Sequence, residues 1–145
     1  MRLEQGLAII TFKDKSYTFD CFVEDGISSE NGRGDNEIVY GSNGFKSGVV
    51  KFPTEKITIN LLPSPESIVE TKELNQMYIK SGAPKFTVRI ISTQSGKTIK
   101  RDYKNCVFVS QFIESNILGT TLGTITAVVD GTPTGVELKG VESNG

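Results

Sequence analysis

The sequence predicts a mainly β fold, a single-domain β-sandwich or barrel of about six to eight strands with one flanking α-helix at about residues 65–81. Two patterns carry this prediction. Ile, Val and Thr cluster in short runs that Gly, Asn, Asp and Ser separate, which is typical of strands joined by turns. A single segment carries both helix start and helix stop signals. The 145 residues, 37% hydrophobic and 23% charged, predict one domain over residues 1–145 with a buried core.

The N-terminal third predicts a hairpin followed by a long loop. Apolar runs at residues 7–12 and 17–23 flank a short polar link, and the second run alternates apolar with polar residues. Residues 24–48 hold six glycines, and a short strand at 37–40 is the one interruption. Loops this long are uncommon in compact domains and tend to be functional. A surface loop without a partner is the alternative.

The helix follows an alternating strand that ends near Leu62. Ser64 is in the place of an N-cap, with a proline at the first helical position and an acid in the first turn. Leu74 and Tyr78 are four residues apart, so one face of the helix is apolar. Gly82, with a proline soon after it, ends the helix.

The C-terminal third predicts three strands and a tail. Residues 85–91 and 98–112 flank a Ser-Gly-Lys turn, which indicates a second hairpin. A last strand over 121–129 ends at an Asp-Gly turn signal. The polar, glycine-containing residues from about 132 onwards are predicted to form a loose tail.

The composition disfavours most enzyme classes. The chain has no histidine, which removes His general bases and almost every catalytic zinc site. The two cysteines, Cys21 and Cys106, are too few for a disulfide scaffold and are interpreted as partly buried free thiols, with a single bridge as the alternative. No apolar run is long enough to span a bilayer. We therefore expect no catalytic residues, no cofactor and no metal site.

Charge patterns point to surfaces rather than to chemistry. Lys plus Arg is 16 and Asp plus Glu is 17, a balance that argues against a dedicated nucleic-acid binder. The basic residues at 97–104 are interpreted as a solvated face or as edge guards, and alternatively as a contact for an acidic neighbour. The glycine-rich stretch 41–48 lacks the residue order of a phosphate-binding loop. The Arg-Gly-Asp at 33–35 is short enough to occur by chance.

The order of these parts resembles a known family. The resemblance is carried by short patches between about residues 24 and 96: a Glu-Asp-Gly-Ile segment at 24–27, Gly-Ser-Asn-Gly at 41–44, Lys-Ser-Gly at 46–48, the strand at 56–62 that leads into the helix, and Phe-Thr-Val-Arg at 86–89. In layout the chain resembles tail tube proteins of contractile-tailed bacteriophages.

The resemblance implies a structural subunit and no catalysis. Members of that family form homo-hexameric rings in which the sheets of six subunits join, and the rings stack into a tube inside a tail sheath. The implied partners are the sheath, baseplate and tape-measure proteins, while DNA transits an acidic or neutral lumen without specific binding, and no membrane is involved. The implied location is the tail of the virion, after synthesis in the cytoplasm of the host bacterium.

The residues expected at subunit interfaces lie in the long loop and on the helix. They are Arg33, Asp35, Asn36 and Glu37 in the loop, and Leu74 and Tyr78 on the helix face. For the helix pair, packing inside the subunit is the favoured alternative.

Two other functions stay open. One is a baseplate or tail-terminator protein of the same fold, which would form one ring and no tube. The other is a monomeric β-sandwich recognition module. Sugar-binding surfaces favour exposed Trp and Tyr, and the chain has no Trp and four Tyr, which weighs against the second.

Overall fold

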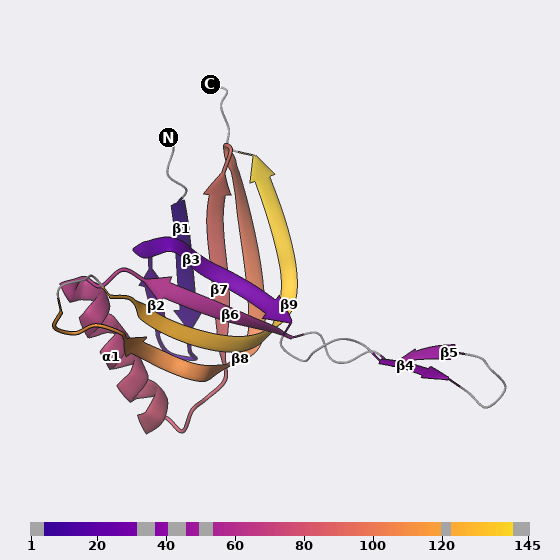
Figure 1. Cartoon of the computed structure of the whole chain (residues 1–145), viewed down its shortest axis with the longest axis horizontal. Helices are drawn as coiled ribbons and strands as arrows, with labels where there is room; N and C mark the ends of the chain where they lie inside the picture. Colours follow the sequence, from indigo (N-terminus) through magenta and orange to yellow (C-terminus); the bar gives the residue numbers. More distant parts are fainter. Residues whose placement is uncertain (1–4, 32–36, 41–45, 50–53, 120–122, 141–145) are drawn as a thin grey trace.

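The computed structural model describes residues 5–31, 37–40, 46–49, 54–119 and 123–140. The chain forms nine strands and one helix in these residues (Figure 1). In order they are β1 (Gln5–Thr11), β2 (Ser16–Phe19), β3 (Phe22–Asn31), β4 (Glu37–Tyr40), β5 (Lys46–Val49), β6 (Glu55–Leu61), α1 (Pro65–Lys80), β7 (Phe86–Gln94), β8 (Lys97–Glu114) and β9 (Ile125–Gly140).

Seven strands form one antiparallel sheet in the order β2-β1-β7-β8-β9-β6-β3, while β4 and β5 form a separate two-stranded hairpin. The end strands β2 and β3 are linked by two residues only, Asp20 and Cys21, so the two ends of the sheet lie close together. The sheet therefore curls into a nearly closed barrel. The predicted mainly β fold with one helix is confirmed.

Two long strands, β8 and β9, run through both halves of this barrel. Residues 97–104 of β8 pair with residues 132–140 of β9, and residues 107–114 pair with residues 125–130. Four register shifts interrupt this ladder. Such irregularities bend strands and increase their twist, which lets one pair of strands serve two differently oriented halves of a sheet.

The core lies between the β6–β9 half and the β1–β7–β8 half. Alternate residues of β6 are buried, and they meet the alternate buried residues of β9 across the sheet. Aromatic rings fill the end beneath α1, where Phe86 packs against Phe12 and Phe108 with ring centroids 5.0 and 4.8 Å apart. The helix closes this end of the barrel, because Leu74 and Tyr78 belong to the same core cluster.

The helix forms where the sequence predicts it. Ser64 is the N-cap, and its hydroxyl accepts a hydrogen bond from the Ser67 amide at 3.1 Å. Pro65 occupies the first turn, where a missing amide hydrogen costs nothing. Gly82 follows the helix with a φ of 79°, a conformation that glycine adopts without strain.

Parts of two regions that were predicted to be irregular are strands, and for these parts the predictions were wrong. The loop predicted over 24–48 begins as strand, since β3 continues to Asn31 by pairing with β6. The tail predicted from Thr132 is the second half of β9. This strand continues through Asp130 and Gly131 to Gly140 because β8 pairs with it along its length. In both cases a partner strand remote in sequence outweighs local turn signals.

Gly131 lies within β9, where its lack of a side chain allows close packing, and it does not form a turn. It pairs with Glu55 of β6, and a Cβ added to it would lie 2.6 Å from the Sγ atom of Cys106. The absence of a side chain at this position lets the Cys106 thiol pack directly against the β9 backbone.

We expect Gly131→Ala to lower the free energy of unfolding by about 1–3 kcal/mol, because the added methyl overpacks the core against Cys106. Gly135→Ala is the matched control, since a Cβ there meets nothing within 4 Å. Urea unfolding curves of the two variants and the unsubstituted chain measure the difference. Adding Cys106→Ala to Gly131→Ala should restore part of the loss, and equal costs for the two glycine variants would contradict the packing argument.

Candidate assembly surface

The candidate assembly surface is the half of the sheet whose strand edges lack pairing partners. This four-stranded half consists of β1, β7, residues 97–104 of β8 and residues 132–140 of β9. In Figure 1 its β7, β8 and β9 ends rise beyond β3 and β6. One of its faces continues the core, and the other carries charged side chains.

Each side of the four-stranded half has an open stretch of strand edge among the described residues. On one side, β6 pairs with β9 only up to Gly131, so residues 132–140 of β9 have β8 on one side and no described strand on the other. On the opposite side, β2 covers β1 from Ala8 to Thr11, which leaves Gln5 to Leu7 uncovered. Open edges present unpaired amide and carbonyl groups that readily pair with another chain.

The core face becomes an exposed apolar surface next to the β9 edge. Leu138 pairs with Ile99 of β8. Val136 pairs with Arg101, which in turn pairs with the buried Ile90 of β7. Val136 is 70% exposed and Leu138 is 61% exposed, because the β3–β6 layer does not extend this far. Apolar side chains beside an open edge are typical of a surface that another chain covers.

The opposite face, here called the charged face, carries a ladder of ion pairs across β7, β8 and β9. Arg89 donates from Nε to Oδ1 of Asp102 at 2.6 Å, and this hydrogen bond is the main cause that raises the pKa of Arg89. Further along, Lys100 and Lys139 both approach Oε1 of Glu137, at 3.9 and 3.5 Å. The acids of this ladder are thus occupied by basic neighbours.

The junction between the two halves holds a tyrosine hydroxyl and a cysteine thiol, and both have raised pKa values. The Tyr103 hydroxyl donates to Oε1 of Glu55 at 3.0 Å, and burial raises the pKa of Tyr103 to about 12. Burial likewise raises the pKa of the Cys106 thiol to about 12. A thiol with such a pKa stays protonated at neutral pH and is a poor nucleophile.

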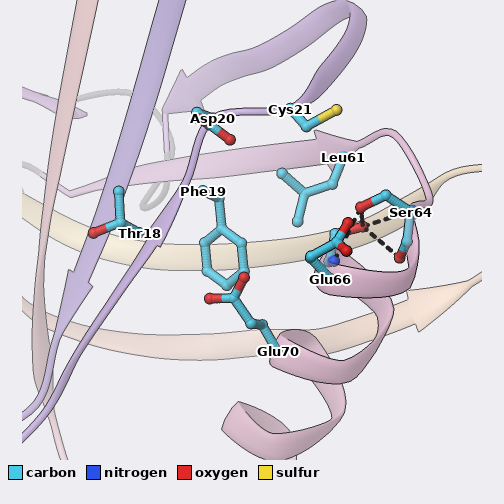
Figure 2. A pocket seen from close by; sticks show the side chains of 9 residues that line it. Thr18, Phe19, Asp20, Cys21, Leu61, Ser64, Glu66 and Glu70 are labelled. Carbon is cyan, nitrogen blue, oxygen red and sulfur yellow. Dashed lines mark hydrogen bonds between the residues drawn. The ribbon is translucent and has the colours of Figure 1, made fainter.

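A small pocket lies between the β2–β3 link and the N-terminus of α1 (Figure 2). Its volume is about 50 Å³, and Asp20, Glu66 and Glu70 contribute carboxylates to its wall. The hydroxyls of Ser64 and Ser67 are engaged in the helix cap. Within the described part of the chain, no group of three or more His, Cys, Asp or Glu side chains could hold a metal ion.

The helix residues predicted at an interface lie inside the subunit. Leu74 is fully buried, and the Tyr78 ring packs edge-on against Phe108 at 4.9 Å while its hydroxyl accepts from the Phe108 amide at 3.4 Å. This is the intramolecular packing that the alternative interpretation expected. The exposed apolar side chains of the helix are Val69 and Ile79.

The loop residues predicted at an interface are not brought together by the described structure. Arg33, Asp35 and Asn36 lie outside the described residues, and Glu37 begins β4. Their interfacial role stays a prediction. Cys21 and Cys106 are both free thiols, as expected.

Sequence reasoning missed the β9 edge, although a signal for it was present. Residues 136–139 read Val-Glu-Leu-Lys, an alternation of apolar and charged side chains that is typical of a half-covered strand. The Asp-Gly pair before it masked this pattern, because the same pair is a common turn signal.

The comparisons with known proteins are structural. No protein-family model matches the sequence, and no curated protein matches it. No helix in the described residues is long and apolar enough to cross a membrane.

Three solved structures align with the chain at low sequence identity. A chain of the anti-feeding prophage baseplate, 6-fold symmetrised, aligns with TM-score 0.52 and 9% identity, covering 98% of this chain and 97% of that one. A chain of the anti-feeding prophage cap, its tube terminating cap, aligns with TM-score 0.54 and 13% identity, covering 92% and 88%. A chain of an extracellular contractile injection system, the PVC sheath-tube complex, aligns at TM-score 0.47, too low to carry an argument.

The pKa shifts at the junction predict a loss of stability in alkaline solution. Tyr103 and Cys106 have ordinary pKa values of 10.0 and 9.0 and folded values of about 12. Above about pH 9 the unfolded chain therefore releases protons that the folded chain retains, so the free energy of unfolding falls as the pH rises towards 12. Urea unfolding at about pH 8 and about pH 10.5 measures this fall.

We expect Cys106→Ala to lose less stability between these two pH values than the unsubstituted chain does. Cys21→Ala is the control, because Cys21 is only partly buried and should leave the full loss in place. An equal loss in all three proteins would exclude Cys106 as a cause.

The two alignments with TM-scores above 0.5, both at less than 25% identity, show that the chain shares its fold with a chain of the anti-feeding prophage baseplate and a chain of its tube terminating cap.

Proposed function

We propose that the chain is a structural subunit of a phage tail or a phage-tail-like particle, and that it assembles edge to edge into rings that stack as a tail tube. The observation that carries the proposal is the pair of open edges on the four-stranded half. Neighbouring strands in β1-β7-β8-β9 are all antiparallel, so β9 runs opposite to β1. A neighbour's β1 placed beside β9 therefore continues the antiparallel alternation without interruption.

A single edge-to-edge contact provides about as much free energy as association costs. Full burial of Val136 and Leu138 would contribute about 1.5–3 kcal/mol each. Each new backbone hydrogen bond adds a net ~0.5–1.5 kcal/mol. Association costs ~4–15 kcal/mol in lost rotational and translational freedom. One contact is therefore marginal, whereas ring closure gives each copy two neighbours and covers the open stretches of both β9 and β1.

The solved structures with the same fold support a ring. They come from a baseplate resolved with 6-fold symmetry and from a cap that terminates a tube. A homo-hexamer, with sheath, baseplate and tape-measure proteins as partners in the virion tail, is the assembly that follows from the resemblance. DNA would transit its lumen, after synthesis of the subunit in the host cytoplasm. No step of this role requires catalysis or a cofactor.

The β4–β5 hairpin is the element best placed for stacking. Figure 1 shows it well away from the seven-stranded sheet, at the end of β3 and β6. An isolated two-stranded hairpin is marginally stable in water and gains from packing against another surface. In a stack of rings, the next ring supplies that surface.

A second candidate is a single ring that never becomes a tube. It is favoured by the two solved structures described above with TM-scores over 0.5, because one is a chain of a baseplate and the other a chain of a tube terminating cap. The two candidates share the edge-to-edge ring and differ only in stacking.

The edge contact predicts that Val136→Lys with Leu138→Lys abolishes assembly. Two buried ammonium groups at the contact would be desolvated without partners, while the subunit itself should keep its fold because both side chains are exposed in it. Negative-stain electron microscopy and light scattering of concentrated protein measure assembly, and circular dichroism checks the fold.

The matched control is Val69→Lys with Ile79→Lys, which changes two exposed apolar side chains on α1 instead. It should leave rings intact. The proposal fails if the unsubstituted chain stays monomeric at high concentration, or if both double variants assemble equally well.

Removing the β4–β5 hairpin should separate ring formation from stacking. Asn31 pairs with Glu55, so a two-residue Asn-Gly turn can join β3 to β6 directly in place of residues 32–54. We expect this variant to fold and to form single rings that do not stack. Long tubes from the shortened chain would contradict a stacking role for the hairpin.

A further inference from the structure

We propose that Asn75 of α1 is an edge guard, a side chain that prevents residues 107–113 of β8 from pairing with the same segment of a second copy of this chain. By blocking this edge, Asn75 directs self-association to the open edges of β9 and β1. The inference rests on the proposed function only for the role of those two edges. The block itself belongs to the single chain and can be measured without ring assembly.

Residues 107–114 of β8 form a further stretch of strand edge. β7 pairs with β8 only as far as Cys106, while β9 pairs with β8 as far as Glu114. Beyond Cys106, the side of β8 that faces away from β9 therefore has no neighbouring strand among the described residues. The edge of such a strand is a template on which a strand of another chain can pair.

The sequence of this edge favours pairing with itself. Residues 107–113 read Val-Phe-Val-Ser-Gln-Phe-Ile, with no charged residue, no proline and no glycine. Within this segment Val109 is 55% exposed and Ile113 is 63% exposed. Segments of six or seven residues with high β propensity and low charge are the ones that stack into tightly packed sheets of many copies. An open edge of this composition would therefore be prone to aggregation.

The open part of β9 has the opposite composition. Residues 132–140 contain Pro133 and two glycines, and Glu137 and Lys139 are charged. Proline, glycine and charge all weaken indiscriminate pairing of strand edges. The fold thus leaves open the edge that is less prone to aggregation, and it covers the edge that is more prone to it.

The helix α1 takes the position that a neighbouring strand would occupy beside β8 (Figure 1). Three helix residues spaced three apart, and so on one face, contact the strand. The contacts are Lys72 with Glu114 at 3.6 Å, Asn75 with Phe112, and Tyr78 with the Phe108 amide at 3.4 Å. A helix uses its backbone groups internally, so only its side chains can satisfy the strand edge.

Asn75 reproduces the hydrogen bonds of a paired strand. Its Nδ2 donates to the Phe112 carbonyl at 2.8 Å, and its Oδ1 accepts from the Phe112 amide at 3.2 Å. A residue on a neighbouring antiparallel strand would exchange the same two bonds with Phe112. A carboxamide carries both a donor and an acceptor, so one side chain satisfies both groups. Asparagine is among the less favourable residues for a helix interior, which indicates a role outside the helix.

A second copy of this chain is the partner that the uncovered edge fits. Two copies related by a twofold axis present the same segment to each other, and antiparallel pairing satisfies this symmetry. In a pair centred on Gln111, Val109 of each copy lies opposite Ile113 of the other, so exposed apolar side chains meet across the contact. This contact would join the chains in a geometry different from a ring closed through β9 and β1.

Asn75→Ala opens the edge and tests the inference. Hydrogen exchange at the Phe112 amide should become about tenfold faster, the effect of one lost hydrogen bond. At a concentration at which the unsubstituted chain is monomeric, we expect the variant to form dimers and larger species that bind thioflavin T. Nuclear magnetic resonance measures the exchange, and sedimentation velocity measures the size of the species.

Adding Val109→Lys to Asn75→Ala should restore the monomer, because a lysine on a strand edge opposes pairing. Val109 is exposed, so the subunit should keep its fold, which circular dichroism checks. Exchange at the Phe112 amide should stay fast, since the second change does not replace the lost Asn75 side chain. A role of Asn75 in stability alone would not produce this separation of exchange from association.

Two variants are matched controls. Gln111→Ala removes the hydrogen bond that Gln111 donates to the Asn75 carbonyl, and it leaves the two bonds between Asn75 and Phe112 in place. Gly131→Ala is expected to destabilise the subunit from β9, where the added methyl meets Cys106. Both variants should stay monomeric at the concentration at which Asn75→Ala associates.

A second measurement needs no change at Asn75. Mild heating opens local contacts before the whole subunit unfolds, so the unsubstituted chain should aggregate through residues 107–113. Val109→Lys should delay this aggregation. Val69→Lys makes the same change at an exposed valine of α1 and should not delay it. Equal delays in the two variants would show an effect of net charge and would contradict the inference.

Three results with Asn75→Ala would also overturn the inference. Equal association of Asn75→Ala and Gly131→Ala would trace it to lost stability. A monomeric Asn75→Ala with fast exchange at Phe112 would show that the uncovered edge does not pair. Association that persists with Val109→Lys would place the contact elsewhere. Ring formation by the unsubstituted chain is read separately by electron microscopy, and its absence would overturn the proposed function while leaving this test intact.

Discussion

The pairing of β8 with β9 is the constraint on which the rest of the structure depends. It extends over 97–114 and 125–140, and among the described strands it is the one ladder that belongs to both halves of the barrel. Its register shifts bend the two strands so that β6 can pair with one half of β9 while β7 pairs with the opposite half of β8. Loss of this ladder would separate the core from the four-stranded half.

The same constraint creates the open edge. Because β9 is longer than β6, its residues beyond Gly131 have no second neighbour in the described chain. Edge strands in soluble proteins are usually short, twisted away or guarded by charge. Here Glu137 and Lys139 guard one face, while Val136 and Leu138 leave the other apolar. An edge protected on one face only suits a defined partner on the other.

The sequence predicted the elements that depend on local interactions, and it missed those that depend on contacts between residues remote in sequence. The helix was predicted almost to the residue because its signals, the Ser64 cap and Gly82, act within a few residues of it. The second half of β9 was missed, because its alternation at 136–139 is short and its partner, residues 97–104 of β8, is remote in sequence. Leu74 and Tyr78 show the same limit, because a helical apolar face is identical in sequence whether it packs inside a subunit or between subunits.

The placement of the aromatic rings weighs between assembly and recognition. A recognition module that binds sugars presents aromatic faces to solvent. In the described residues, Tyr17, Tyr78 and Tyr103 are buried, and the phenylalanines are buried or packed against the core. The exposed apolar groups are instead aliphatic, and those on β9 stand beside an unpaired strand edge. Backbone pairing between copies uses such a surface directly.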